Sequence, residues 1–217
     1  MKSKKSPEKA KLFNPKLFPM DLARVVCACL PLVFNIKKIY ATDKAKEKLK
    51  GRALLVANHS CFRDPLIASC CFWYRRVFYL AAENVMKNRF VSALLKGVGC
   101  IKINRNICDI ESIKKAVNTL KDGHILTVFP QGGIQGEEDI NTIKSGVVFM
   151  AMQSKSPIVP CYIHSGKLTE RICVVIGEPI TFSFKNAFPS MKELDDFALL
   201  VLEKMQECKK IYENSRR

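Results

Sequence analysis

Short apolar runs alternate with segments of helical periodicity from residue 53 onward, and this alternation constrains the fold more than any other feature of the chain. The strand-like runs cover residues 53–57, 77–82, 99–103, 125–130, 157–163 and 171–177. The helical patterns lie near residues 64–73, 84–96, 109–121 and 143–153. This order predicts an α/β fold with a mostly parallel sheet flanked by helices. A closing helix is expected after Ser190, which has the capping partner Glu193 three residues later.

The length and charge of the chain indicate one folded domain and a basic N-terminal segment. With 217 residues, of which 48% are hydrophobic, the chain can bury one sizeable core. We assign residues 51–217 to this domain. The formal net charge is +16, and residues 1–50 carry 13 basic and 4 acidic side chains, so +9 of it lies there. Such an excess predicts an anionic partner.

An apolar segment at residues 22–38 follows the lysine-rich start of the chain. Its uninterrupted part, residues 25–34, contains Pro31 and is preceded by Asp21 and Arg24, so it is too short to span a bilayer. We expect a helix that associates with anionic phospholipids at the cytoplasmic face of the cell membrane. A signal peptide is the alternative, although the long lysine-rich leader argues against it. We expect no nucleic-acid partner, because few aromatic residues interleave the lysines.

The ten cysteines do not indicate a disulfide framework or a metal site. The chain is of medium size and has no clear export signal, so reduced thiols are expected. No pair has C-x-x-C spacing, and Cys27, Cys29, Cys70 and Cys71 do not have the spacing of a common zinc site. We therefore predict no metal.

His59 follows the first strand-like run directly, and Asp64 comes five residues later. Residues at this spacing diverge by about 140° on a helix, but a turn can fold the carboxylate back onto the imidazole. Asp64 would then fix the tautomer of His59, which becomes a general base. Ser60 and Cys61 are poor candidates for the nucleophile, so a substrate hydroxyl would attack in a direct acyl transfer. The alternative is a structural histidine with Asp64 as a helix cap before Pro65.

Two later stretches have the composition of a phosphate site. Residues 99–105 leave a strand with Lys102 and Arg105, and residues 129–136 contain Gly132, Gly133 and Gly136. Glycines let backbone N–H groups approach a ligand, and basic side chains supply the opposite charge. Lys144, near a helix start, is a further candidate.

The blocks NHSCFRDP, GCIKINR, FPQGG and IVPCYI, in this order, resemble the four motif blocks of the glycerolipid acyltransferase family, which includes the 1-acylglycerol-3-phosphate acyltransferases. The resemblance covers roughly residues 50–180. It implies that His59 is the base and Asp64 its partner. It also implies that Arg105 and the loop with Gln131, Gly132 and Gly133 bind the phosphate of the acceptor.

By the same resemblance, the acceptor is the sn-2 hydroxyl of lysophosphatidate and the product is phosphatidate. The co-substrate is acyl-CoA, acyl carrier protein or acyl phosphate, with no other cofactor. The third block departs from the family pattern F-P-E-G-T-R, because Gln131, Gly133 and Ile134 replace its glutamate, threonine and arginine. Two alternatives therefore stay open: another lyso-lipid acceptor, or phospholipid binding without turnover. His124 and His164 are expected to be structural.

Overall fold

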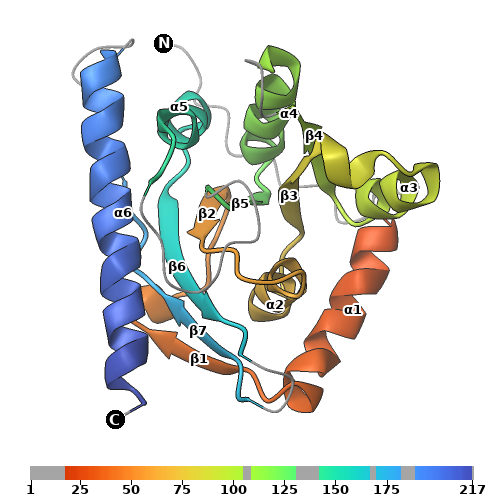
Figure 1. Cartoon of the computed structure of the whole chain (residues 1–217), viewed down its shortest axis with the longest axis vertical. Coiled ribbons are helices and arrows are strands. Elements are labelled where there is room, and N and C mark those ends of the chain that lie inside the picture. The colour runs from red at the N-terminus through yellow and green to blue at the C-terminus, as the bar shows by residue number, and fades with distance from the viewer. Residues whose placement is uncertain (1–17, 105–108, 131–141, 167–169, 182–188, 217) are drawn as a thin grey trace, which may run out of the picture.

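The computed structural model describes residues 18–104, 109–130, 142–166, 170–181 and 189–216. Seven strands within these ranges form one sheet in the order β1-β7-β6-β2-β5-β3-β4. Neighbouring strands are parallel except for the antiparallel pair β6 and β7. The mostly parallel sheet predicted from the sequence is therefore confirmed, and Figure 1 shows it between helices.

The strands lie close to the positions that the apolar runs predict. Their bounds are β1 Lys37–Tyr40, β2 Ala53–Ala57, β3 Val77–Ala82, β4 Cys100–Ile103, β5 Ile125–Val128, β6 Ile158–His164 and β7 Cys173–Ile176. Strand β1 was not predicted; it pairs in parallel with β7 and so joins the sheet at its edge.

The helices also match the sequence patterns. Their bounds are α1 Phe18–Val33, α2 Asp64–Cys71, α3 Arg89–Gly97, α4 Ile110–Lys121, α5 Ser145–Ser154 and α6 Met191–Asn214, with 3-10 turns η2 Lys44–Lys46 and η3 Glu83–Met86. The pattern at 84–96 divides into η3 and α3, because the Asn88 side chain caps α3 by accepting from the N–H groups of Phe90 and Val91. The expected capping box of Ser190 and Glu193 begins α6.

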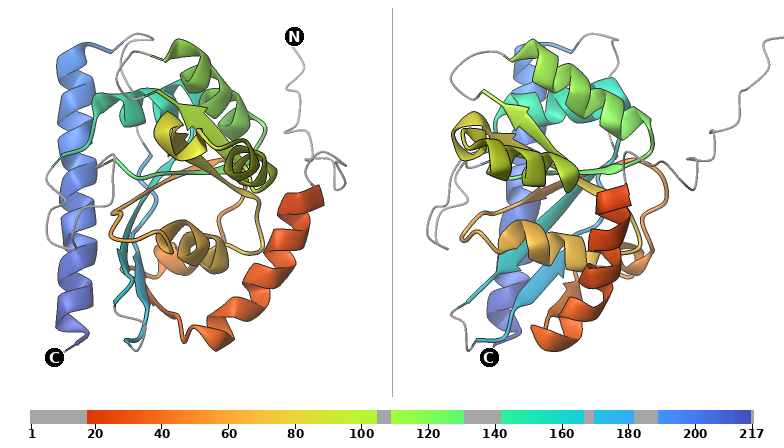
Figure 2. Two further views of the ribbon diagram at one scale, coloured as in Figure 1. Left: turned by 45° about the vertical axis from the view of Figure 1, so that its right-hand side comes forward. Right: turned by 90° about the vertical axis from the view of Figure 1, so that its right-hand side faces the viewer.

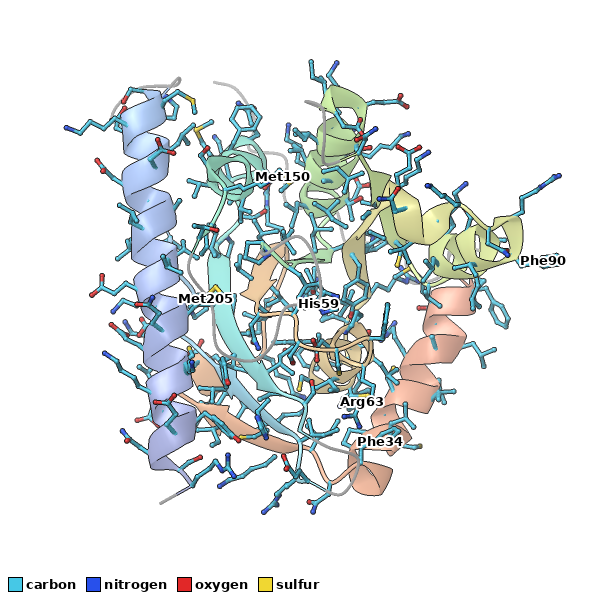
Figure 3. The ribbon with its side chains drawn as sticks, in the orientation of Figure 1. Phe34, His59, Arg63, Phe90, Met150 and Met205 are labelled. Carbon is cyan, nitrogen blue, oxygen red and sulfur yellow. The ribbon has the colours of Figure 1, made fainter. Side chains whose placement is uncertain are left out.

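Two hydrophobic clusters lie on the two faces of the sheet. Alternate residues of β2 point to opposite faces, so Leu54 joins the cluster formed with α4, α5 and α6, and Leu55 joins the cluster formed with α2. Figure 3 shows Met205 on the side of α6 that faces β6. The helices on both faces make this a three-layer α/β domain.

Helix α1 lies beside α2 at the edge of the domain (Figures 1 and 2). Asp21 accepts hydrogen bonds from Nε and Nη2 of Arg76 at 2.9 and 2.7 Å, and Nη1 of Arg24 donates to it at 3.0 Å. Arg24 also donates to the carbonyl groups of Trp73 and Tyr74. The charges within this apolar helix thus contact the domain.

The opposite side of α1 exposes large apolar side chains, namely those of Phe18, Leu22, Val25 and Val26. No helix within the described part of the chain has both the length and the apolar character that crossing a bilayer requires.

Candidate active site

The candidate site lies where β2 leads into α2. His59 is two residues beyond the end of β2 and stands near the centre of the molecule in Figure 3. Asp64 is the first residue of α2, and its backbone N–H donates to the carbonyl of Cys61 at 3.1 Å. This tight turn reverses the chain between the two residues. The site thus lies at the carboxyl edge of the sheet, where ligands of parallel α/β proteins commonly bind.

The turn brings the imidazole and the carboxylate into direct contact. Nδ1 of His59 lies 3.0 Å from Oδ2 of Asp64, which also accepts the N–H groups of Ser60 at 2.7 Å and Cys61 at 2.8 Å. Asp64 is fully buried, and the side chain of His59 is 15% exposed. The carboxylate points back to the loop that precedes α2. Asp64 is therefore not the cap of this helix, a position occupied by Arg63.

The second oxygen of Asp64 faces β6 and the loop. The hydroxyl of Ser165 donates to Oδ1, and Sγ of Cys61 lies 3.4 Å from it. Burial raises the pKa of Asp64, but the hydrogen bonds from His59, from the Cys61 N–H, from Ser165 and from the Ser60 N–H together lower it below the ordinary value. The carboxylate therefore stays ionised near neutral pH. An ionised acceptor at Nδ1 favours the tautomer in which Nε2 can accept a proton.

Aromatic rings fix the position of the imidazole. His59 stacks on Phe129, with ring centroids 4.5 Å apart and an interplanar angle of 23°. Phe129 is in turn parallel to Tyr79 at 6.5 Å. The Tyr79 hydroxyl donates to the carbonyl of Pro65 at 2.6 Å and lies 2.6 Å from Oγ of Ser69. These contacts connect β5, β3 and α2 below the site.

A cavity of about 620 Å³ opens beside His59. It lies between α1, α2, β3 and α3, and most of its lining is apolar. Its lining includes Met20, Cys27, Phe62, Leu66, Val77, Tyr79, Leu80, Val98 and Phe129. A cavity of this size and lining fits a hydrocarbon chain better than a polar ligand.

The predicted phosphate-binding residues have less structural support than the pair of His59 and Asp64. Nζ of Lys102 lies 2.5 Å from Oε1 of Glu83, so it already has an anionic partner. Lys144 is exposed directly before α5. Neither lysine lines the cavity beside His59. The remaining predicted residues lie outside the described ranges, namely Arg105, Gln131, Gly132, Gly133 and Gly136.

The other two histidines lie away from the pair. His124 is half-buried against Phe78, and burial, with the nearby Arg76 charge, lowers its pKa. His164 is buried at the end of β6, stacks on Tyr212 and has Nε2 3.4 Å from Glu170. Within the described ranges, no group of three or more His, Cys, Asp or Glu side chains is arranged to hold a metal ion.

Sequence reasoning missed Ser165 and Tyr79. Ser165 comes shortly after the IVPCYI block, but 101 residues separate it from Asp64, so no local spacing rule connects them. Tyr79 has the alternating pattern of a strand residue, which gives no sign of its hydroxyl contact with α2.

Comparison with known proteins gives consistent matches. A family model described as Acyltransferase matches residues 35–164. The 1-acyl-sn-glycerol-3-phosphate acyltransferase of Bacillus subtilis is 26% identical over 147 residues, which are 65% of this chain and 73% of that protein. The Limnanthes alba protein of the same name is 25% identical over 169 residues, or 73% of this chain and 59% of that protein. The chain thus matches about three fifths to three quarters of the length of these relatives.

A solved structure shares the fold. The 1-acyl-sn-glycerophosphate (LPA) acyltransferase PlsC from Thermotoga maritima superposes with a TM-score of 0.61, covering 91% of this chain and 81% of that chain. At 16% sequence identity, this match shows the common fold alone.

Proposed function

Since the chain belongs to the acyltransferase family, whose model matches more than half of it, we propose that it transfers a fatty acyl group from a thioester donor to the sn-2 hydroxyl of lysophosphatidate. The product is phosphatidate. The observation that carries this proposal is the contact between His59 and Asp64 beside an apolar cavity of about 620 Å³. The names of the relatives from Bacillus subtilis and Limnanthes alba support the choice of acceptor.

In this reaction His59 acts as general base. Its Nε2 accepts the proton of the acceptor hydroxyl while the oxygen attacks the carbonyl carbon of the thioester. The C–S bond then breaks, and the imidazolium returns the proton to the leaving thiolate. Asp64 stabilises the imidazolium, because its carboxylate is ionised and 3.0 Å from Nδ1. The donor is acyl-CoA or acyl carrier protein; with acyl phosphate, phosphate leaves in place of the thiol.

The cavity beside His59 would hold the acyl chain. Each methylene group that leaves water for such a lining contributes about 0.8 kcal/mol to binding. Met20 and Cys27 of α1 form part of the lining, as do Leu95 and Val98 near the end of α3. The two helices that lie at the edge of the domain thus also contribute to the substrate cavity.

The same two helices form the surface that we propose contacts the cytoplasmic face of the cell membrane. Helix α3 buries none of its residues, and its Phe90 is 88% exposed and points away from the domain in Figure 3. Leu94, one turn later on α3, is also exposed, as are Leu22 and Val25 on α1. Figures 1 and 2 agree that α3 lies near the N-terminal end of α1. A lipid could then pass from the bilayer into the adjoining cavity.

The reaction is tested with purified protein, lysophosphatidate and a panel of acyl-CoA and acyl carrier protein donors, with products identified by mass spectrometry. We expect phosphatidate, and a loss of at least about 100-fold in kcat for His59→Ala. His124→Asn is the matched control, since it changes a histidine away from the cavity. Absence of phosphatidate with every donor would contradict the proposal. Lipid binding without turnover, or acylation of a different lyso-lipid, would favour one of the alternatives that the third block suggests.

Membrane contact is tested by flotation with vesicles that contain anionic phospholipid. We expect Phe90→Asp to weaken flotation strongly, and added salt to weaken it in the wild type. The control is Leu199→Asp, because Leu199 is 63% exposed on α6, on the other side of the domain. Equal flotation of the two variants would refute this orientation.

A further inference from the structure

The end of β6 and the residues that follow it are held against the candidate site, in part by the side chain of Asn58, which hydrogen-bonds to β6 in the way that a strand backbone would. The last parallel pairing of β2 with β6 is Ala57 with Cys161. Beyond it, the buried amide of Asn58 continues the ladder, because its Nδ2 donates to the carbonyl of Ile163 at 2.8 Å and its Oδ1 accepts the N–H of the same residue at 2.7 Å. The position of residues 163–165 is therefore fixed relative to His59, the neighbour of Asn58.

Arg63 holds the same segment from the other side. Its Nη2 donates to the carbonyl groups of Ser165 at 3.0 Å and Gly166 at 2.8 Å. Figure 3 shows Arg63 near α2, below His59. The backbone of Ser165 is thus fixed from both ends of the loop between β2 and α2.

In this position, the buried hydroxyl of Ser165 contacts the carboxylate of Asp64. Ser165 is 2% exposed, and its hydroxyl donates to Oδ1 of Asp64. The other contact of this oxygen in the described residues is the Cys61 thiol at 3.4 Å, and a thiol is a weak donor. Oδ2, in contrast, accepts His59 and two backbone N–H groups. Ser165 is therefore the main hydrogen-bond donor to the oxygen that His59 does not contact.

We propose that Ser165 is a positioning residue for the acyl transfer: its hydroxyl orients the Asp64 carboxylate and limits the basicity that the carboxylate confers on His59. This inference rests on the proposed function. A donor on Oδ1 draws negative charge away from Oδ2, so the carboxylate stabilises an imidazolium at His59 less than it would without this donor.

Removal of the hydroxyl has a directional consequence. In Ser165→Ala the carboxylate loses a donor, holds more charge at Oδ2 and stabilises protonated His59 more strongly. The acidic limb of the kcat/KM profile should move to higher pH. The titratable and charged groups on the segments around Asp64 are His59, Cys61 and Arg63 on its own loop, and His164 and Glu170 beside Ser165. The substitution leaves all of these side chains in place.

The experiment compares pH profiles of kcat/KM for the wild type, Ser165→Ala, Ser165→Thr and Ser154→Ala. Ser154 is the matched control: it is a fully buried hydroxyl, but it hydrogen-bonds at the end of α5, near the amino end of β6. We expect Ser165→Ala to lower kcat about 10- to 100-fold, to change the KM of the donor little and to move the midpoint of the acidic limb to higher pH. Ser165→Thr keeps the hydroxyl and should restore the midpoint.

A second measurement separates this inference from the proposed function. NMR titration of ¹⁵N-labelled histidines, with the signals of His59 assigned from His59→Asn, reports its protonation without any turnover. We expect the same upward shift of the His59 midpoint in Ser165→Ala. An inactive wild type with this shift present would refute the acyl transfer and leave the coupling of Ser165 to His59 intact. An active wild type, with the midpoint and kcat of Ser165→Ala equal to those of Ser154→Ala, would overturn the role of Ser165.

Discussion

Asp21 connects α1 to the α/β domain, so Asp21→Asn tests what holds this helix in place. Arg76 is 9% exposed, and two of its nitrogen atoms donate to the Asp21 carboxylate at 2.9 and 2.7 Å. Removal of one partner from a buried ion pair costs about 3–5 kcal/mol, and a single hydrogen bond to a charged group contributes about 1.5–3 kcal/mol. Asp21 is 26% exposed, and asparagine keeps one acceptor oxygen, so we expect a loss of about 2–3 kcal/mol.

The assay is urea unfolding, combined with hydrogen exchange of residues 18–33 to detect local release of α1. Asp43→Asn is the control, because Asp43 forms an ion pair with Lys46 at 2.7 Å but is 95% exposed. We expect no measurable loss of stability there, since solvent screens exposed pairs. Equal stability of the two variants would refute the reasoning that the burial of Arg76 gives the Asp21 pair its strength.

The pH dependence of this variant follows from the same pair. The hydrogen bond from Arg76 is the largest cause of the lowered pKa of Asp21, which outweighs the opposing effect of burial. A lowered folded-state pKa contributes stability that is present above the unfolded value, near 3.9, and is lost as the pH falls through the folded value. When the pH falls below about 4, the free energy of unfolding of Asp21→Asn should therefore decrease less than that of the wild type.

Three other substitutions test the site and its support. Asp64→Asn should lower kcat by about 10³–10⁴-fold in the acylation assay, because the amide no longer holds the Nδ1–H tautomer of His59, the base that we propose; a loss below tenfold would contradict this proposed role. Gly99→Ala should lower the free energy of unfolding more than Gly123→Ala. Both glycines have a φ near +85° to +90°, so the backbone strain of the substitution is similar at the two positions. The contacts differ, because a Cβ at Gly99 would lie 2.6 Å from a methionine of α1, whereas a Cβ at Gly123 would contact nothing within 4 Å. Glu83→Gln should lower the KM for lysophosphatidate about two- to fivefold if Lys102 binds the phosphate, and an unchanged KM would remove Lys102 from the site.

Local patterns were sufficient to predict most of the fold and the contact between His59 and Asp64 at the centre of the candidate site. The run at 53–57 is apolar at every position because β2 is covered on both faces, which is typical of a central parallel strand. His59 and Asp64 are five residues apart, so a single turn decides whether they meet. In both cases the interactions that matter join residues near each other in the sequence or follow from burial.

Strand β1 could not be predicted because its sequence, KKIY, is too short and too polar to show a strand pattern. Its pairing with β7 joins Lys37 to Cys173, far along the chain. The strand lies at the edge of the sheet, where lysine is tolerated. Its two lysines are half-buried, and Nζ of Lys38 donates to the carbonyl of Cys71 at 3.0 Å. Tertiary pairing, and not local propensity, therefore makes this segment a strand.

The residues that hold the candidate site in place could not be predicted either, because their contacts also join parts of the chain that are far apart in the sequence. Asn58 and Ser165 are ordinary polar residues in the sequence, and their roles come from contacts across more than 100 residues. The crossover from β2 to β6 passes through β3, β4 and β5, so the register of the sheet has to be known before these contacts can be inferred. A pattern of alternating polar and apolar residues predicts which residues form strands, but it does not predict which strand ends lie side by side.

Helix α1 shows why mean hydropathy does not tell whether one face of a helix is suited to lipid contact. A count of charges within the segment includes Asp21 and Arg24 as obstacles to membrane association. Both side chains are bonded to the domain, to Arg76 and to the carbonyl groups of Trp73 and Tyr74, so they do not oppose contact of the other face with lipid. The exposed face carries large apolar side chains, including Phe18 and Leu22. The direction in which each side chain points, and not the average over the segment, therefore determines whether such a helix can lie on a bilayer.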